Sequence, residues 1–322
     1  MRPGGFWGLI LVALVAGIIF VALGNNEYFY FAGYVILQSM IMAIAWNILG
    51  GFTGYVNFGS AGFFAVAAYT TIALNKYLQG LGLQPVLPVF IAASAIVCGL
   101  IGLGTGYLTL RFRGVYFAIA TLALAVVFQT LANNWDYTGG AKGAYLLTPP
   151  PPPLFTSYVK FLFLVMLVMA LFAIVVSRYI ANSKFGRGLA AVRDDEVAAE
   201  CMGVPTLRLK LISTTVMGVL MGMAGAPYPF YVTYVDPQSA FSLGIAVNAI
   251  AMPMIGGTAY WYGPVIGAIL LGTAQEVISV TISSELNVLI VGVILVGFVV
   301  LAPGGLIGLY KSLRRGRVKA SA

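Results

Sequence analysis

The hydrophobic positions of the chain fall into long runs that are separated by short polar segments. A helix that crosses a bilayer needs about 20 consecutive apolar residues, and the longer runs reach this length. Because lipid-exposed backbone must satisfy its own hydrogen bonds, every run is predicted to be an α-helix. The ten runs lie near 6–23, 29–49, 59–75, 88–110, 115–132, 158–178, 207–226, 241–256, 264–282 and 287–302. The pattern predicts an all-α polytopic membrane protein with about ten transmembrane helices.

The run at 241–256 is the weakest of the set. It is short, and Pro253 with Gly256 and Gly257 is predicted to interrupt it. A broken or re-entrant helix is tolerated at membrane depth where its backbone faces protein or a water-filled cavity. The sequence therefore leaves open whether 241–256 spans the membrane fully.

The first run also has two interpretations. Arg2, the apolar stretch after it and Ala22-Leu23-Gly24 together have the layout of a cleavable signal peptide. The stretch is longer than the apolar region of a typical signal peptide, which favours an uncleaved first span. Cleavage would leave the topology of the remaining runs unchanged.

Composition excludes most soluble functions. The 322 residues are 61% hydrophobic and 8% charged, whereas a soluble domain carries about 25% charged residues. A soluble enzyme, a nucleic-acid-binding protein and a disordered chain are thereby excluded. The absence of histidine excludes His general bases and Ser-His-Asp triads, and two cysteines, Cys98 and Cys201, make neither a disulfide framework nor a zinc site.

The net charge of +8 reflects topology. When the ends of the ten runs are assigned alternately to the two sides, fourteen of the seventeen basic residues share one side and Lys76, Lys142 and Lys160 lie on the other. The positive-inside rule makes the basic side cytoplasmic, with both termini on it. The fourteen are Arg2, Arg111, Arg113, Arg178, Lys184, Arg187, Arg193, Arg208, Lys210, Lys311, Arg314, Arg315, Arg317 and Lys319. Residues 303–322 are predicted to form a basic cytoplasmic tail of a single transmembrane domain, 1–322.

The largest predicted cytoplasmic loop, 179–206, contains four of the nine acidic residues. Asp194 or Asp195 can N-cap a short helix, and Gly203 followed by Pro205 suits its end. The small residues Ala198 and Ala199 lie in its centre. Such a helix can insert into a groove on a partner protein, and the alternative is a solvated connector between two membrane spans.

Several segments resemble known transporters. The spacing of Ala198-Ala199, three residues and Gly203 is similar to the EAA loop of ABC importer permeases, with Glu196 one position earlier than that motif's glutamate. The wider chain resembles the M-type permeases of branched-chain amino acid transporters. The segments that carry this resemblance are 51–64 (GFTGYVNFGSAGFF), 110–123 (LRFRGVYFAIATLA), 133–140 (NNWDYTGG), 184–199 (KFGRGLAAVRDDEVAA) and 262–268 (YGPVIGA).

The resemblance implies a transporter of several chains in the bacterial inner membrane. A periplasmic solute-binding protein would deliver the solute, this chain and a sister permease subunit would form a heterodimeric pathway, and ABC ATPase subunits would drive it. The chain has no Gly-x-x-x-x-Gly-Lys-Ser/Thr motif, so it is expected to bind no cofactor, and ATP would be used by the partner subunits. The resemblance implies a cytoplasmic coupling helix that contacts the ATPase through Arg193, Asp194, Asp195, Glu196, Ala198, Ala199 and Gly203.

Polar residues inside apolar runs are candidates for the translocation path. They are Asn47, Asn57, Thr121, Gln129, Asn248 and Glu276. Each could line the path or form a hydrogen bond between helices. Glu276 is the one acidic residue well inside an apolar run, and a buried charge in a bilayer is costly unless it has a function or a partner.

The expected solutes are branched-chain or other small amino acids. The sequence departs from the family at Ala141 and Lys142, after Thr-Gly-Gly, and at Ala259, where a glycine is usual, so importers of urea, short amides or aromatic acids stay open. An ion-coupled secondary carrier, in which Glu276 would titrate, is the competing class. An intramembrane enzyme and a channel are weaker alternatives, because the chain has neither clustered catalytic residues nor a charged ring.

Overall fold

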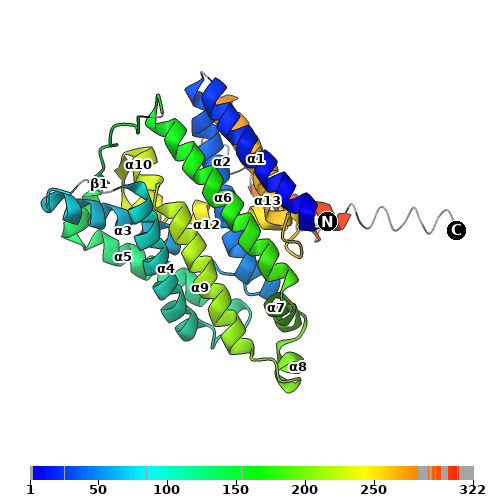
Figure 1. Ribbon diagram of the computed structural model, residues 1–322. Coiled ribbons are helices and arrows are strands. Elements are labelled where there is room, and N and C mark those ends of the chain that lie inside the picture. Colours follow the sequence, from blue (N-terminus) through cyan, green and yellow to red (C-terminus); the bar gives the residue numbers. More distant parts are fainter. Residues whose placement is uncertain are drawn as a thin grey trace.

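The computed structural model describes residues 3–24, 26–83, 86–153 and 155–281, together with 289, 292–293, 295–298, 304–309 and 311. Long helices dominate it and lie side by side, and two short helices, α7 and α8, project at one end (Figure 1). The long helices are α1 (Pro3–Leu23), α2 (Glu27–Thr53), α3 (Ser60–Gly80), α4 (Leu87–Thr109), α5 (Val115–Asn133), α6 (Tyr158–Asn182), α9 (Thr206–Gly225), α12 (Leu243–Gly256) and α13 (Gly263–Thr281).

Short elements connect them. At the projecting end, α7 (Lys184–Asp194) and α8 (Glu196–Cys201) join α6 to α9. At the other end lie two 3-10 turns, η1 (Asp136–Thr138) and η2 (Gly140–Lys142), the helices α10 (Tyr228–Val232) and α11 (Pro237–Ala240), and two strands, β1 (Ala144–Tyr145) and β2 (Tyr234–Val235). The strands pair antiparallel, with Ala144 opposite Val235.

The first nine predicted apolar runs each overlap one of the long helices. The tenth, 287–302, lies largely outside the described residues, as does the tail at 303–322, so the total of ten spans stays a prediction. Among the described residues, seven helices are long and apolar enough to cross a membrane. The α3 helix is not one of them, and α13 contributes a shorter apolar segment, Gly263–Ser279.

The α2 helix forms the centre of the molecule. Its residues from Gln38 to Thr53 are all buried, and it packs against α6, α9, α12 and α13. A helix that is apolar on every side suits such a position. The α1 helix is more apolar than α2 but lies on the outside: 6% of its most apolar window is buried, against 78% for α2. Exposed apolar helices of this kind are typical of a protein surrounded by lipid.

The most extensive helix contact joins α4 to α9, and glycines make it close. A Cβ atom at Gly218 would lie 2.4 Å from the carbonyl oxygen of Cys98, and one at Gly222 would lie 2.6 Å from that of Ser94. These two glycines form a small-xxx-small pair, which lets membrane helices approach to backbone contact. Among the glycines of α4, Gly102 also lies at this contact, since its Cβ would lie 2.8 Å from the Thr214 oxygen, whereas Gly104 has open space around it.

The 241–256 segment is interrupted at a different place from the one predicted. Pro253 lies inside α12, and the break lies between α11 and α12, at Phe241 and Ser242. The helix does end at Gly256, and the chain turns at Gly257, whose φ of 119° suits glycine. With 14 residues, α12 is about 21 Å long, which is shorter than the hydrocarbon core.

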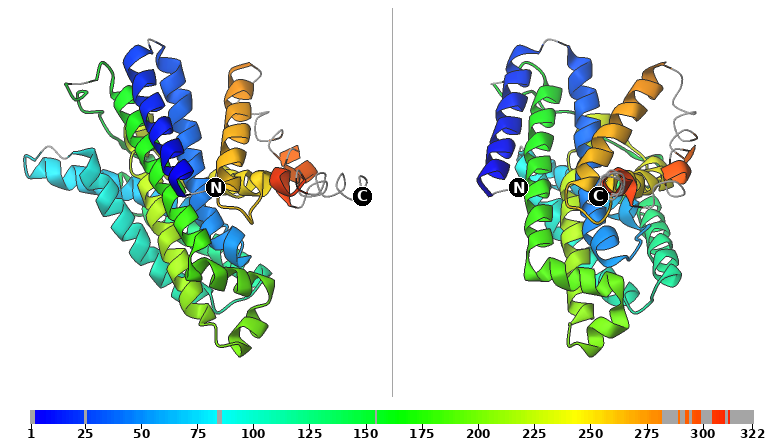
Figure 2. Two further views of the ribbon diagram at one scale, coloured as in Figure 1. Left: turned by 45° about the vertical axis from the view of Figure 1, so that its right-hand side comes forward. Right: turned by 90° about the vertical axis from the view of Figure 1, so that its right-hand side faces the viewer.

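The basic residues separate by end, as the alternating assignment predicts. The end that carries α7 and α8 also receives the C-termini of α4 and α6 and the N-termini of α5 and α9, which hold Arg111, Arg113, Arg178, Arg208 and Lys210 (Figures 1 and 2). Lys160 begins α6 at the other end, where it donates to the Gly24 oxygen at 3.0 Å. Lys76 lies at that end too, where it donates to the Tyr137 oxygen at 2.9 Å, as does Lys142 in η2.

We predict that Gly218→Ala lowers stability and that Gly104→Ala does not. The first places a methyl group against backbone of α4 and should cost roughly 1–3 kcal/mol, the range for overpacking. The second meets open space and should be neutral or slightly stabilising, because alanine is the better helix former. The midpoint of thermal unfolding in detergent measures both, and equal midpoints would contradict the close α4–α9 contact.

Candidate functional site

The candidate site is the end of the molecule formed by α7 and α8, which hold the residues predicted to contact an ATPase. Ser183 caps α7, since its hydroxyl accepts a hydrogen bond from the Gly186 amide at 3.1 Å. Leu189 and Val192 are the buried residues of this helix and pack into the core. The sequence predicts this segment as part of the 179–206 loop, so the helix α7 is a difference from that prediction.

The α8 helix confirms the short helix that was predicted. Asp195 is its N-cap, and the Asp195 carboxylate accepts from the Ala198 amide at 3.0 Å. Gly203 has a φ of 79° and its amide donates to the Glu200 oxygen, which stops the helix where the sequence indicated. The helix has six residues. Its function is therefore set by which side chains face the membrane helices and which face away.

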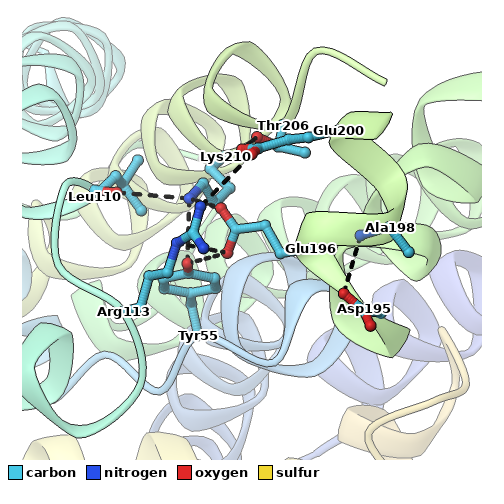
Figure 3. Close-up of polar contacts among 9 residues, drawn as sticks. All are labelled: Tyr55, Leu110, Arg113, Asp195, Glu196, Ala198, Glu200, Thr206 and Lys210. Carbon is cyan, nitrogen blue, oxygen red and sulfur yellow. Dashed lines mark hydrogen bonds and ion pairs between the residues drawn. The ribbon is translucent and has the colours of Figure 1, made fainter. Parts of the chain in front are cut away.

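One face of α8 is fixed to the membrane helices by charge (Figure 3). Glu196 and Glu200 are four residues apart and therefore share this face. A Glu196 oxygen lies 2.6 Å from Nζ of Lys210 in α9, and a Glu200 oxygen lies 3.6 Å from Nη2 of Arg113. Thr206 also donates to Glu200, at 2.6 Å.

Lys210 is the centre of this cluster and is 3% exposed. Besides Glu196, its ammonium group donates to the hydroxyl of Tyr55 at 3.1 Å and to the backbone oxygen of Leu110 at 3.5 Å. These three contacts match the three N–H donors of a lysine. They connect α8, α9, the segment after α2 and the end of α4 at one point.

Tyr55 completes the arrangement. Its hydroxyl donates to the second oxygen of Glu196, and its ring packs edge-on against Phe117 of α5 at 5.1 Å between ring centroids. Burial raises the pKa of the Tyr55 hydroxyl, as does its hydrogen bond to Glu196. It therefore remains a proton donor at neutral pH. We name Tyr55, Arg113, Glu196, Glu200 and Lys210 the clamp.

The charge state of Glu196 is set by competing effects. Burial raises the pKa of its carboxyl group, but the hydrogen bonds from Lys210 and Tyr55 and the nearby Arg113 outweigh it, so the pKa is lowered overall. A lowered folded-state pKa means that the carboxylate stabilises the fold above its unfolded pKa. That stabilisation is lost as the pH falls through the folded pKa.

The opposite face of α8 is open. Val197 is 54% and Met202 is 84% exposed, and Ala198 and Cys201 are exposed as well. Of the residues predicted to contact the ATPase, Arg193, Asp194, Asp195, Ala198 and Gly203 are exposed, whereas Ala199 is buried and Glu196 faces the permease itself. We name Val197, Ala198, Cys201 and Met202 the outer face of α8.

The path candidates do not gather at one point. Asn57 and Thr121 lie together, because each hydrogen-bonds to the Phe58–Gly59 backbone, and they line a cavity of about 10 Å³. Gln129 donates to the Pro237 oxygen at 3.4 Å, a bond between α5 and α11. Asn57 also donates to the sulfur of Met217 in α9 at 3.6 Å, so each of the three residues has a contact with another element, which was one of their two interpretations.

The other three path candidates lie on helices that pack against one another, α2, α12 and α13. Asn47 is fully buried, and neither its amide oxygen nor its amide nitrogen has a hydrogen-bond partner among the described residues. The side-chain oxygen of Asn248 in α12 accepts a hydrogen bond from Gln275 in α13 at 3.0 Å. Glu276 is the next residue of α13 and is partly buried. This helix group combines an unsatisfied amide with the one acidic residue inside an apolar run.

Comparison with known proteins identifies the family. Residues 28–299 match the family described as "Branched-chain amino acid transport system / permease component". The chain belongs to this family of branched-chain amino acid transport permeases. That match confirms the resemblance seen in the sequence.

Individual members of the permease family agree. The chain is 27% identical to the high-affinity branched-chain amino acid permease LivM of Salmonella typhimurium over 87% of this chain and 71% of that protein. It is 28% identical to LivM of Escherichia coli, over 83% and 67%. A solved metal-chelate type ABC transporter in an inward-facing conformation overlaps 94% of this chain with 15% identity and a TM-score of 0.46, too low to establish a shared fold.

Sequence reasoning missed most of the clamp of this permease. Glu200 and Tyr55 carried no predicted role, and Arg113 and Lys210 were read only as markers of topology. Lys210 gave the available signal, since it is one of two cations, with Arg208, near the start of an apolar run, and a charge that becomes buried there needs a partner. Its partner Glu196 could not be inferred, because nothing in the local spacing requires the pair.

We predict that the two halves of the central ion pair depend on each other. Lys210→Met should lower the free energy of unfolding by roughly 3 kcal/mol, because it leaves the Glu196 charge without its main partner. Adding Glu196→Gln to that variant should restore more than half of the loss. Chemical unfolding of the purified protein in detergent measures this cycle.

The matched control for that cycle is Arg193→Met. Its ion pair with Asp194 spans 3.4 Å but is open to solvent on both sides, so its loss should change stability by less than roughly 1 kcal/mol. Additive losses from Lys210→Met and Glu196→Gln would contradict the clamp.

Proposed function

We propose that this chain is the membrane-spanning permease subunit of an ABC importer for branched-chain or other small amino acids. The family match and the LivM relatives support the solute class. The observation that carries the mechanism is α8, which is clamped to the membrane helices on one face and open on the other. That is the arrangement a coupling helix needs.

The end that carries α7 and α8 would face the cytoplasm, with both termini on that side. The basic residues at this end support the orientation through the positive-inside rule. The opposite end, with β1, β2 and the aromatic loops, would receive the periplasmic solute-binding protein. A sister permease subunit would complete the pathway as a heterodimer.

ATP-driven motion would enter the permease through the outer face of α8. This face is small and apolar at its centre, so it suits insertion into a groove on an ATPase subunit. The clamp connects α8 to Lys210 in the second turn of α9, and α9 packs against α2, α3 and α4. A displacement of α8 would therefore move α9 and would not be absorbed by bending of the connecting segment 202–205.

The solute would pass along α2, α12 and α13. These helices carry Asn47, Asn248 and Glu276. At Gly256 and Gly267 the backbones of α12 and α13 lie in direct contact, because neither glycine has a side chain to separate them. A polar solute loses hydrogen bonds to water when it enters the membrane. Polar side chains without partners inside the protein can replace those hydrogen bonds.

Ala198→Trp tests the coupling role directly. The exposed site leaves room for the indole in the isolated permease, so the variant should fold and insert normally. In the reconstituted transporter it should reduce solute-stimulated ATP hydrolysis to the unstimulated rate, because the ring blocks docking of α8. Ala198→Ser is the control and should keep stimulation.

Normal stimulation in Ala198→Trp would refute the coupling role of the outer face. Uptake by the permease without any ATPase would instead support the ion-coupled carrier and refute the importer.

Glu276→Gln tests the path. Loss of a charge-assisted contact corresponds to roughly a ten-fold effect, and we expect uptake to slow by about that factor. Glu27→Gln, the same change at an exposed position that starts α2, should leave uptake unchanged. Unchanged uptake kinetics in Glu276→Gln would assign this residue a structural role only.

A further inference from the structure

An apolar groove runs along the outside of the permease between α1, α2, α6 and α13. Its volume is about 710 Å³. The walls are built from side chains of all four helices: Leu9, Ile10, Leu37, Met40, Leu171 and Ile269. Neither the clamp nor the path candidates contribute to it, so its function is separate from coupling and from the solute path.

At one end of this groove lies Arg178, a cationic side chain with no ion-pair partner among the described residues. The guanidinium group of Arg178 lies 3.8 Å from the ring centroid of Phe6 and 5.6 Å from that of Trp261. Its Nη1 atom is buried and has no hydrogen-bond partner within the described part of the chain. No described acidic side chain forms an ion pair with it. Arg178 is half-buried, and a charge with a buried nitrogen and no partner is costly, so this end of the groove suits an anionic group.

The dimensions of the groove match one leaflet of a bilayer. Leu167 and Arg178, both in its lining, are eleven residues apart on α6, which corresponds to about 16 Å along the helix. Half of the hydrocarbon core is about 15 Å. A ligand with its charge at Arg178 would therefore extend its apolar part to the middle of the membrane.

The surroundings of Arg178 place it at the membrane surface. Phe6, Trp7, Tyr179 and Trp261 gather there, and aromatic residues of this kind concentrate where the bilayer meets water. A second cavity of about 400 Å³, lined by Trp7 and Tyr179 on its outer side, continues the groove outward. Trp7 and Tyr179 are 59% and 77% exposed. A lipid can therefore enter from the bilayer.

We propose that this groove binds one anionic phospholipid, with the phosphate group on Arg178 and an acyl chain between α1 and α6. Arginine pairs well with phosphate because its N–H groups bond two oxygens at once. Basic pockets between transmembrane helices on the cytoplasmic side are known to hold anionic headgroups. A bound lipid would also stabilise the position of α1, which packs mainly against α6 and has few contacts with the other helices.

Native mass spectrometry of the complete transporter, released into mild detergent and titrated with phosphatidylglycerol, tests this site. We expect one tightly held phosphatidylglycerol per copy of this chain, and binding at least roughly ten-fold weaker in Arg178→Gln. Lys184→Gln removes the same charge from an exposed position at the same end of the molecule and should bind like the wild type.

A second pair of variants tests the apolar half and does not alter the charge. Ala13→Phe fills the groove and should weaken phosphatidylglycerol binding, whereas Ala16→Phe on the exposed side of the same helix should not. This pair keeps the test decisive even if Arg178→Gln fails to fold.

Three results would overturn the proposal. They are wild-type affinity in both Arg178→Gln and Ala13→Phe, equal affinity for phosphatidylcholine and phosphatidylglycerol, and binding to the separated chain but not to the complete transporter. The last result would mean that the sister subunit covers the groove.

Discussion

A lysine ammonium group that is removed from water must be neutralised, and this requirement organises the end of the molecule that faces the ATPase in our proposal. Lys210 is buried in the second turn of α9, and it is neutralised by Glu196 from α8. Because removing either partner leaves an uncompensated charge, the pair holds α8 against α9 more firmly than a surface ion pair would. Tyr55 and Leu110 bring α2 and α4 to the same point.

The consequence for mechanism is a continuous path of packed groups from α8 into the membrane. Lys210 leads into α9, and the glycines of α9 hold it against α4 at backbone distance. Closely packed helices shift as units because their interiors do not compress. A push on the outer face of α8 would thus be transmitted to the α4–α9 pair and to α2, which forms the core and carries Asn47.

The apolar runs were predictable because lipid imposes one strong rule, a helix about 20 residues long, and nine of the ten runs overlap helices of the structure. The short helix α8, its cap at Asp195 and its stop at Gly203 also followed from local chemistry. By contrast, α7 was missed because Gly186 and Gly188 weaken its helical pattern. The structure shows why glycine is needed at 186: a Cβ there would lie 2.2 Å from the Ile180 oxygen. The clamp was missed because Tyr55, Arg113 and Lys210 come from distant segments, and sequence spacing contains no information about such pairs.

Cys201 gives the most direct test of the central claim that the outer face of α8 docks an ATPase subunit. It is the exposed one of the two cysteines, and Cys98 is buried. A benzophenone attached to Cys201 and activated by light in the assembled transporter should form a covalent product with the ATPase subunit, and the yield should change with bound nucleotide. A product with lipid or with the periplasmic binding protein, and none with the ATPase, would contradict the claim.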